Sequence, residues 1–225
     1  MNVSIHPSLL KHEQPFAFGI IHYKGIQVSD SPQMIKGRLQ LFQESIYFEL
    51  QDKNVTDFEG IKEWRTIFKK LGKDPNRYRH SAEALYRRIK KQNYLKSVHS
   101  AIDINNFFSL EYQSPIGLYD VSKINGDISL RLGESQEAYD GLNGRFMSVE
   151  SILVSVDDSG PFGSPFVDST RTAVNKKTTD AIQIVYLRPS LSPKDQIKLT
   201  DSLKNMFIQV HGGTAEVDIL TNQPS

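Results

Sequence analysis

The chain contains no cysteine, which removes several classes of chemistry at once. Disulfides, thiolate metal ligands and cysteine nucleophiles are excluded, so any reaction must use Ser, Thr, Asp, Glu, His or Lys side chains. Long hydrophobic runs are also lacking: no stretch of about 18 apolar residues occurs, and the first residues do not have the order of a signal peptide. We therefore expect no membrane partner and a cytoplasmic location.

Several sequence signatures of known sites are missing as well. The six histidines form no HExxH pattern, and no acidic cluster is similar to a calcium loop, so no metal is expected. The glycine-rich nucleotide-binding patterns GxxxxGK[ST] and GxGxxG do not occur, and neither does the GxSxG turn of serine hydrolases. We therefore expect no cofactor. A net charge of +1 gives the protein no overall electrostatic attraction for nucleic acid, so RNA binding would depend on a local basic patch. No DNA binding is expected.

The pattern of apolar residues predicts a mixture of strands and helices. With 38% hydrophobic and 24% charged residues, the 225-residue chain has a globular composition. β-Branched and aromatic runs predict strands at 16–28, 45–50, 127–132, 152–156, 181–187 and 215–220, and one from 97 to 112 that bends at 103–106. Helical spacing predicts helices near 32–43, before Gly72, from Ser81, and from Pro193 to Gly212.

These elements predict an α+β fold with a mixed or mainly antiparallel sheet packed with helices. We expect a strand and helix extension at 1–58 packed on a main unit at 59–225, together forming one compact domain. The oligomeric state does not follow from the sequence.

The densest basic region of the chain extends from Lys69 to Lys91. Two interpretations are open: a solvated helix face, in which Glu83 pairs with Arg87, or a surface that contacts phosphates. The residues expected to contact RNA are Arg79, Arg87, Arg88, Lys90 and Lys91.

Three polar residues interrupt an otherwise apolar stretch at Asp103, Asn105 and Asn106. In a structural interpretation, their side chains bond to local backbone groups and fix a bend between strands. In a functional interpretation, they line a pocket and hold an ammonium or hydroxyl group. Both interpretations are open from the residues alone.

Five segments together carry a family resemblance. They are Ser81-x-Glu-x-Leu, the stretch AIDINNFFSLE, the turn from Pro115 to Asp120, the strand from Gly126 to Arg131, and a loop that ends in Thr178. Their order and spacing resemble the B-three/B-four domain of the β subunit of bacterial phenylalanyl-tRNA synthetase. The resemblance covers about residues 60–187, and the helix around Trp64 is similar to shorter, solitary members of that family.

The resemblance implies an editing-domain-like fold and a pocket that accepts the 3′ end of a tRNA or aminoacyl-tRNA. In the synthetase, this domain hydrolyses tyrosine wrongly attached to the phenylalanine tRNA. The chain has no ATP site, so it is not expected to be a complete tRNA ligase. On this hypothesis the catalytic residues are Asp103, Asn106, Asp120 and Asp168, and the substrate-binding residues are Ser81, Asn105, Gly117, Arg131, Thr170 and Thr178.

Two differences from the synthetase pattern bear on activity. Gly117 stands where the synthetase has a histidine in its editing site, and the Gly-Gly-Glu element that recognises the tyrosine hydroxyl is absent, with Asp168 or Thr170 near its place. Three functions therefore remain open. The first is hydrolysis of mischarged aminoacyl-tRNA in trans, the second is non-catalytic RNA binding, and the third is binding of a small amino acid or amine.

Overall fold

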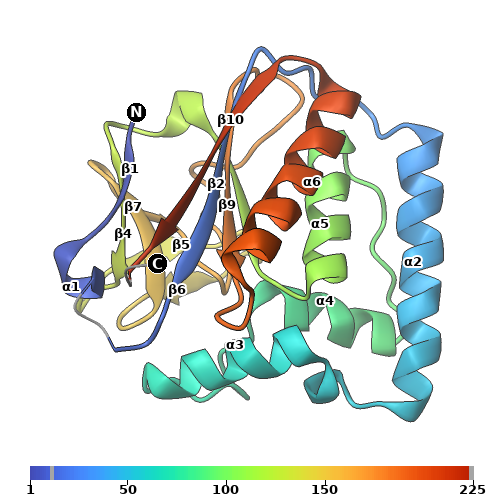
Figure 1. Cartoon of the computed structure of the whole chain (residues 1–225), viewed down its shortest axis with the longest axis horizontal. Coiled ribbons are helices and arrows are strands. Elements are labelled where there is room, and N and C mark those ends of the chain that lie inside the picture. The colour runs from blue at the N-terminus through green and yellow to red at the C-terminus, as the bar shows by residue number, and fades with distance from the viewer. Residues whose placement is uncertain (11–12, 223–225) are drawn as a thin grey trace.

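The computed structural model describes residues 1–10 and 13–222, and it is built around a central antiparallel sheet (Figure 1). This sheet has the order β10-β2-β9-β3. Its strands are β2 (Ala17–Lys24), β3 (Ile116–Asp120), β9 (Ala181–Leu187) and β10 (Thr214–Thr221). All neighbouring pairs run antiparallel.

A second four-stranded sheet has the order β1-β4-β7-β8. It contains β1 (Val3–Ile5), β4 (Ile128–Leu132), β7 (Leu153–Asp157) and β8 (Gly160–Gly163). Only the β1–β4 pair in this sheet is parallel. A separate hairpin pairs β5 (Ala138–Asp140) with β6 (Phe146–Ser148). The expected α+β fold with mainly antiparallel sheets is therefore confirmed.

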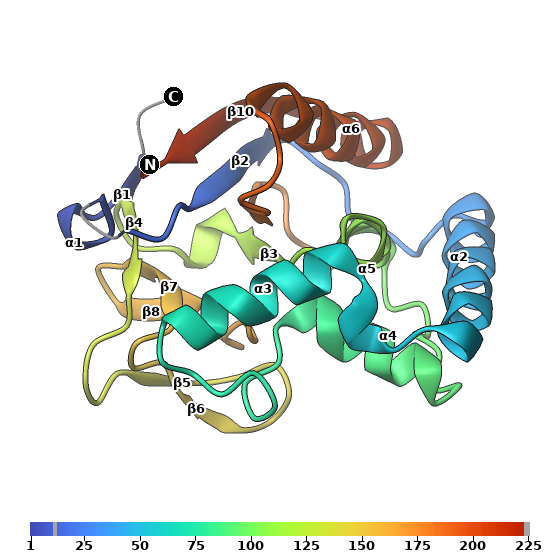
Figure 2. The same cartoon turned by 60° about the horizontal axis from the view of Figure 1, so that its bottom comes forward.

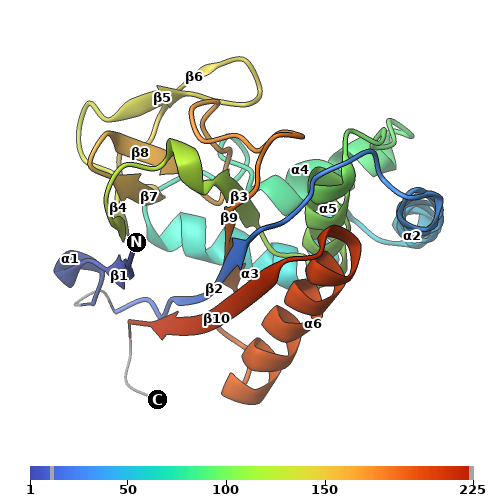
Figure 3. The same cartoon turned by 90° about the horizontal axis from the view of Figure 1, so that it is seen from above.

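Helices cover the face of the central sheet that points away from the second sheet, as the view from above shows (Figure 3). The longer helices are α2 (Gln33–Asp52), α3 (Glu59–Lys70), α4 (Ser81–Lys90), α5 (Ser100–Tyr112) and α6 (Pro193–His211). The short ones are α1 (Pro7–Leu10) and the 3₁₀ turns η1 (Val55–Asp57) and η2 (Val121–Lys123). Helix α6 packs on β2 and β10, α5 packs on β3, and α2 packs on α4 and α5. Helix α3 instead runs across one end of the molecule (Figure 2).

Strands β2 and β9 lie between two hydrophobic cores because alternate side chains of a strand point to opposite faces. Ile21 and Tyr23 belong to the core under the helices, whereas Phe18 and Ile20 belong to the core shared by the two sheets and α3. All seven residues of β9 are buried for the same reason. A nearly continuous apolar run such as 181–187, which only Gln183 interrupts, is therefore expected in this fold.

Two sequence predictions of secondary structure were wrong, and both concern helices. Residues 45–50 belong to α2, and residues 103–106 lie within α5 instead of forming a bend between strands. Helix α5 lacks the usual polar face because most of its length is buried, so it shows no clear helical periodicity. In α2, aromatic residues suggested a strand, but the buried positions recur at helical spacing.

Candidate functional site

A cavity of about 530 Å³ is formed by α4, α5, β3, the turn between β5 and β6, and the loop at 164–168. We call it the cationic cavity. Its charged lining residues are Arg77, Arg79, Arg88, Arg145 and Asp168. Its polar lining residues are Ser81, Asn105, Asn106, Ser109, Asn143 and Ser164. Its apolar lining residues are Ala84, Leu85, Ile102, Ile116, Leu118, Leu142, Phe166 and Val167.

The arginines of this cavity form no ion pairs among the residues that the structure describes. All four arginines are exposed, and none of them forms an ion pair with a carboxylate among residues 1–10 and 13–222. Asp168 is the one acidic residue among the described residues of the lining. Guanidinium groups that are close together and free of carboxylates favour an anionic ligand, in particular phosphate.

Asp168 is the acidic group of the cavity, and its protonation state changes near neutral pH. Burial raises its pKa to about 7, although hydrogen bonds from Tyr119 and Ser164 lower it in part. The Tyr119 hydroxyl donates to Oδ1 over 2.7 Å, and the Ser164 amide donates to the same oxygen over 3.3 Å. Oδ2 has no hydrogen-bond donor in the described part of the chain, so it can accept a proton from a bound molecule.

Tyr119 can reach Asp168 because two glycines leave room for its ring. A Cβ atom on Gly117 would lie 1.9 Å from the Tyr119 hydroxyl oxygen, and one on Gly163 would lie 2.1 Å from it. Real Cβ atoms do not approach so closely, so both positions require glycine while Tyr119 keeps this conformation. The Tyr119 hydroxyl thus occupies the space that a side chain at position 117 would need.

Asn105 and Asn106 both line the cationic cavity, but they differ in their hydrogen bonds. The amide nitrogen of Asn105 donates to the Ile116 carbonyl over 3.0 Å, and its oxygen accepts from Gln183 over 2.9 Å. Asn105 therefore ties α5 to the central sheet. The side chains of Asn106 and Ser81 make no hydrogen bond within the described residues, so they are available to a ligand.

Asp103 lies outside the cavity, fully buried at the other side of α5. Its Oδ2 accepts hydrogen bonds from the hydroxyls of Ser31 and Ser97, each over 2.5 Å, and its Oδ1 accepts from the Val98 amide over 2.9 Å. These hydrogen bonds fix the segments that lead into α2 and α5.

Asp120 and Thr178 contact each other, also away from the cavity. The Thr178 hydroxyl donates to Asp120 Oδ2 over 2.7 Å, and Ser122 donates to Oδ1 through both its amide and its hydroxyl. Burial opposes ionisation of Asp120, but these hydrogen bonds outweigh it and lower its pKa. The pair closes the loop before β9 against the end of β3.

The other two predicted substrate-binding residues also make internal hydrogen bonds. Arg131 donates to both carboxylate oxygens of Glu137, over 2.6 and 2.8 Å, and the Thr170 hydroxyl donates to the Asp140 carbonyl over 3.3 Å. The structure therefore gathers Ser81, Asn105, Asn106 and Asp168 around one cavity, while Gly117 lies outside the lining and packs against Tyr119. It does not bring Asp103, Asp120, Arg131, Thr170 and Thr178 to that cavity.

The predicted RNA-binding residues also separate into two groups. Arg79 and Arg88 line the cavity, whereas Lys90 and Lys91 lie outside its lining at the end of α4. Arg87 donates to the buried Glu83 over 2.8 Å, as the helical spacing had indicated. Arg145 was not predicted, because this residue is far from the basic region in the chain and reaches the cavity through the β5–β6 hairpin.

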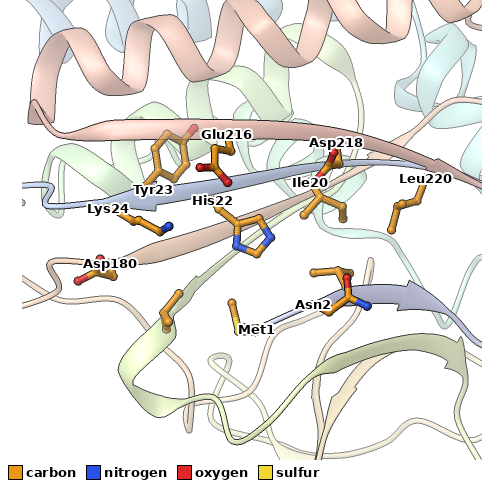
Figure 4. Close-up of a pocket in the computed structure, with 12 residues that line it drawn as sticks. Met1, Asn2, Ile20, His22, Tyr23, Lys24, Asp180, Glu216, Asp218 and Leu220 are labelled. Atoms are coloured by element: carbon orange, nitrogen blue, oxygen red, sulfur yellow. The ribbon is translucent and has the colours of Figure 1, made fainter.

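A second cavity of about 570 Å³ lies between the end of β1 and the strands β2 and β10 (Figure 4). We call it the acidic cavity because Asp180, Glu216 and Asp218 line it, together with His22 and Lys24. Burial lowers the pKa of His22, and the nearby Asp218 and Glu216 oppose this effect. None of the residues predicted to form a site lines this cavity.

Two further features were sought among the described residues, a metal-binding group and a membrane-spanning helix. Among them no group of three or more His, Asp or Glu side chains is placed to hold a metal ion. No helix formed by residues 1–10 and 13–222 has both the length and the apolar character needed to cross a bilayer.

Comparisons with known proteins point to one family. The family described as the B3/4 domain matches residues 63–203, which include most of the cationic cavity. Protein YhzB of Bacillus subtilis (strain 168), described as uncharacterized, is 33% identical over 221 residues, covering 98% of this chain and 100% of that protein.

The same comparisons find β subunits of phenylalanine–tRNA ligase. The subunit from Paramagnetospirillum magneticum is 28% identical over 146 residues, which cover 64% of this chain and 17% of the subunit. The chain thus corresponds to a small part of that subunit. Among solved structures, an N-terminal fragment of the phenylalanyl-tRNA synthetase β subunit from Pyrococcus horikoshii aligns with a TM-score of 0.44 and 12% identity, over 95% of this chain and 50% of the fragment.

Proposed function

The chain belongs to the B3/4 domain family, and from this premise we propose that it binds the aminoacylated 3′ end of a tRNA and hydrolyses the ester in trans. The family also occurs in phenylalanine–tRNA ligase β subunits, which supports a tRNA-related role at the level of the family. The observation that carries the proposal is the cationic cavity, which Asp168 lines together with four arginines that form no ion pair with any described residue. The proposal places the protein in the cytoplasm, with aminoacyl-tRNA as its partner.

The arginines provide the contacts to phosphate. Arg79 and Arg88 approach from the α4 side of the cavity and Arg145 from the β5–β6 turn, so a strand of nucleic acid between them is contacted on two sides. Phe166 also lines the cavity and packs against Tyr78 with ring centroids 5.7 Å apart. Its remaining exposed surface offers a place for a terminal base to stack.

Asp168 is the proposed general base of the reaction. As a carboxylate it accepts a proton from water through Oδ2, and the oxygen of that water attacks the carbonyl carbon of the ester. The bond between that carbon and the ribose oxygen then breaks, and the ribose oxygen takes the proton back from Asp168. Tyr119 holds the carboxyl group in place, and the Asn106 amide or an arginine donates to the developing oxyanion.

The floor of the cavity indicates the kind of amino acid that it accepts. Leu85, Ile102 and Leu118 are among its apolar lining residues, and no glutamate lines it. An apolar side chain would be buried favourably against these residues. We propose an apolar amino acid as the acyl group.

A deacylation assay tests this proposal. We expect the purified protein to hydrolyse at least one member of a panel of aminoacyl-tRNAs, and Asp168→Asn to lower kcat/KM about 10²–10⁴-fold, the usual effect of removing a general base. Asp218→Asn is the matched control, because Asp218 is exposed in the acidic cavity, and it should leave the rate unchanged.

Two outcomes would point to the other functions. Salt-dependent binding of tRNA without turnover of any panel member would favour a non-catalytic RNA-binding module, an alternative that Gly117 supports because it replaces the editing histidine. A thermal shift caused by free amino acids, without any binding of tRNA, would favour a small-molecule pocket.

A further inference from the structure

Helix α2 has a second apolar face that no part of the described chain covers. Its buried side packs on α4 and α5 through Ile35, Leu39, Gln43, Ile46 and Leu50. On the opposite side, Met34, Leu41 and Phe48 are 62%, 68% and 70% exposed. Figure 3 shows α2 at the outer edge of the molecule, away from both sheets.

The exposed residues form a row along the helix axis. Each is seven residues from the next, which corresponds to about two helical turns, so their side chains lie on one line. Single exposed apolar side chains are common on protein surfaces. A row at heptad spacing is instead the pattern by which one helix packs against another.

Gly37 is a second, independent indication of a helix partner. It lies inside α2, where glycine is unfavourable, and a Cβ atom added to it would meet nothing within 4 Å. No packing inside the described chain therefore requires glycine at this position. Gly37 and Ser45 are each four residues from Leu41, so small side chains flank it on both sides and allow another helix to approach closely.

The order of residues along α2 indicates which partner fits. Met34 and Phe48 are equally distant from Leu41, so the row matches itself when it is reversed. The charges that flank this row follow the same rule: Arg38 lies in the first half of the helix, and Glu44 and Glu49 lie in the second half. An antiparallel copy would place basic residues near acidic ones, whereas a parallel copy would place like charges together.

We propose that α2 pairs with α2 of a second copy of this chain, antiparallel, across a twofold axis at Leu41. Such an isologous interface places Met34 against the partner's Phe48 and, by symmetry, Phe48 against the partner's Met34. Interactions between a thioether and an aromatic ring are favourable. No residue of α2 lines the cationic or the acidic cavity, so the pairing does not depend on the proposed function.

Disulfide crosslinking tests the geometry, and the lack of native cysteine makes the experiment clean. Under mild oxidation, Leu41→Cys should form a covalent dimer, because the two Cβ atoms meet at the axis. Met34→Cys and Phe48→Cys should crosslink with each other when mixed, but not when each is alone. Ile197→Cys, at a 51% exposed position on α6, is the control and should stay monomeric.

Sedimentation measurements test the association itself. We expect a monomer–dimer equilibrium for the native chain and a dissociation constant about tenfold or more higher for Leu41→Glu, since a buried anchor residue is replaced by a charge. The substituted residue is exposed in the monomer, so circular dichroism should be unchanged. A chain that is monomeric at all concentrations, a dimer that Leu41→Glu leaves intact, or crosslinking of Met34→Cys with itself would each overturn the proposal.

Discussion

The cationic and acidic cavities have similar volumes, about 530 and 570 Å³, but their charges are arranged differently. In the acidic cavity, Glu216 and Asp218 are exposed on β10 and lie beside His22 and Lys24. In the cationic cavity, arginines that form no ion pair with the described residues lie around a carboxyl group whose pKa burial raises to about 7. Size therefore does not separate the two cavities, whereas the sign of their charge and the desolvated acid of the cationic cavity do.

Removing positive charge from the cationic cavity should weaken tRNA binding far more than removing it from the acidic cavity. We expect the triple substitution Arg79→Ala, Arg88→Ala and Arg145→Ala to weaken tRNA binding by roughly 10²–10³-fold at low salt, because interactions with phosphates supply most of the affinity. The slope of binding against salt should fall by about 0.7 for each phosphate that the protein no longer neutralises. Binding titrations at several salt concentrations measure both quantities.

Lys24→Ala provides the comparison, since this exposed cation lines the acidic cavity. It should change the affinity for tRNA by less than about twofold, as expected for a charge remote from the binding surface. Arg79, Arg88 and Arg145 can each be replaced singly by alanine for comparison. If Lys24→Ala reduces the affinity for tRNA as much as these single substitutions do, the cationic cavity is not the binding surface.

Two glycine substitutions should change stability in opposite directions. Gly117→Ala would force its Cβ into the Tyr119 ring, so the free energy of unfolding should fall by about 1–3 kcal/mol. Gly37→Ala has open space on α2 and should raise it by about 0.5–1 kcal/mol, measured at dilution, where the chain is monomeric. Denaturant unfolding curves measure both changes, and a neutral Gly117→Ala would show that the Tyr119 ring moves freely.

The smallest effect concerns the pH dependence of hydrolysis. Because Asp168 acts as a carboxylate and its pKa is about 7, the rate should rise up to about pH 7 and then level off. The Tyr119 hydroxyl lowers the pKa of Asp168, so Tyr119→Phe should raise that pKa and move the inflexion to higher pH. Profiles of kcat/KM against pH for both proteins measure the shift, and identical profiles would contradict the role of Tyr119.

The pKa of Asp168 also predicts a pH effect on stability. The folded state raises this pKa above its unfolded value, so the folded state favours the protonated acid. Its stabilising contribution is complete below about pH 4 and is lost as the pH rises through about 7. The free energy of unfolding of Asp168→Asn should lack this decrease.

Apolar patterns predicted most strands and helices α3 and α6 well, but they failed for α5 and for the second half of α2. Strands β4, β7 and β9 and helices α3 and α6 lie close to their predicted ranges, because each has a regular apolar pattern. Helix α5 was missed because it is buried around most of its circumference. Its buried Asp103 and Asn105 suggested a polar bend, yet the hydrogen bonds that satisfy them come from segments distant in sequence.

The composition of the cavity was less predictable than the fold. Ser81, Asn105, Asn106, Asp168, Arg79 and Arg88 were selected in advance and do line it, but their functional roles stay predictions. The sequence could not show that Asp168 lines the cationic cavity and that Asp103 does not, because the surroundings of each residue depend on which loops meet in three dimensions. Tyr119 was overlooked because Gly117 was interpreted as the loss of a histidine rather than as room for a neighbouring ring.

The packing of Tyr119 makes the identities of two positions in the family interdependent. Any side chain at position 117 would overlap the Tyr119 ring, so a protein of this fold cannot have both a histidine at 117 and a tyrosine in this conformation at 119. A side chain at 117 is accommodated only when residue 119 also changes, which makes the two residues epistatic. Relatives should therefore fall into two sequence classes, one with a bulky residue at 117 and one with glycine at 117 and tyrosine at 119.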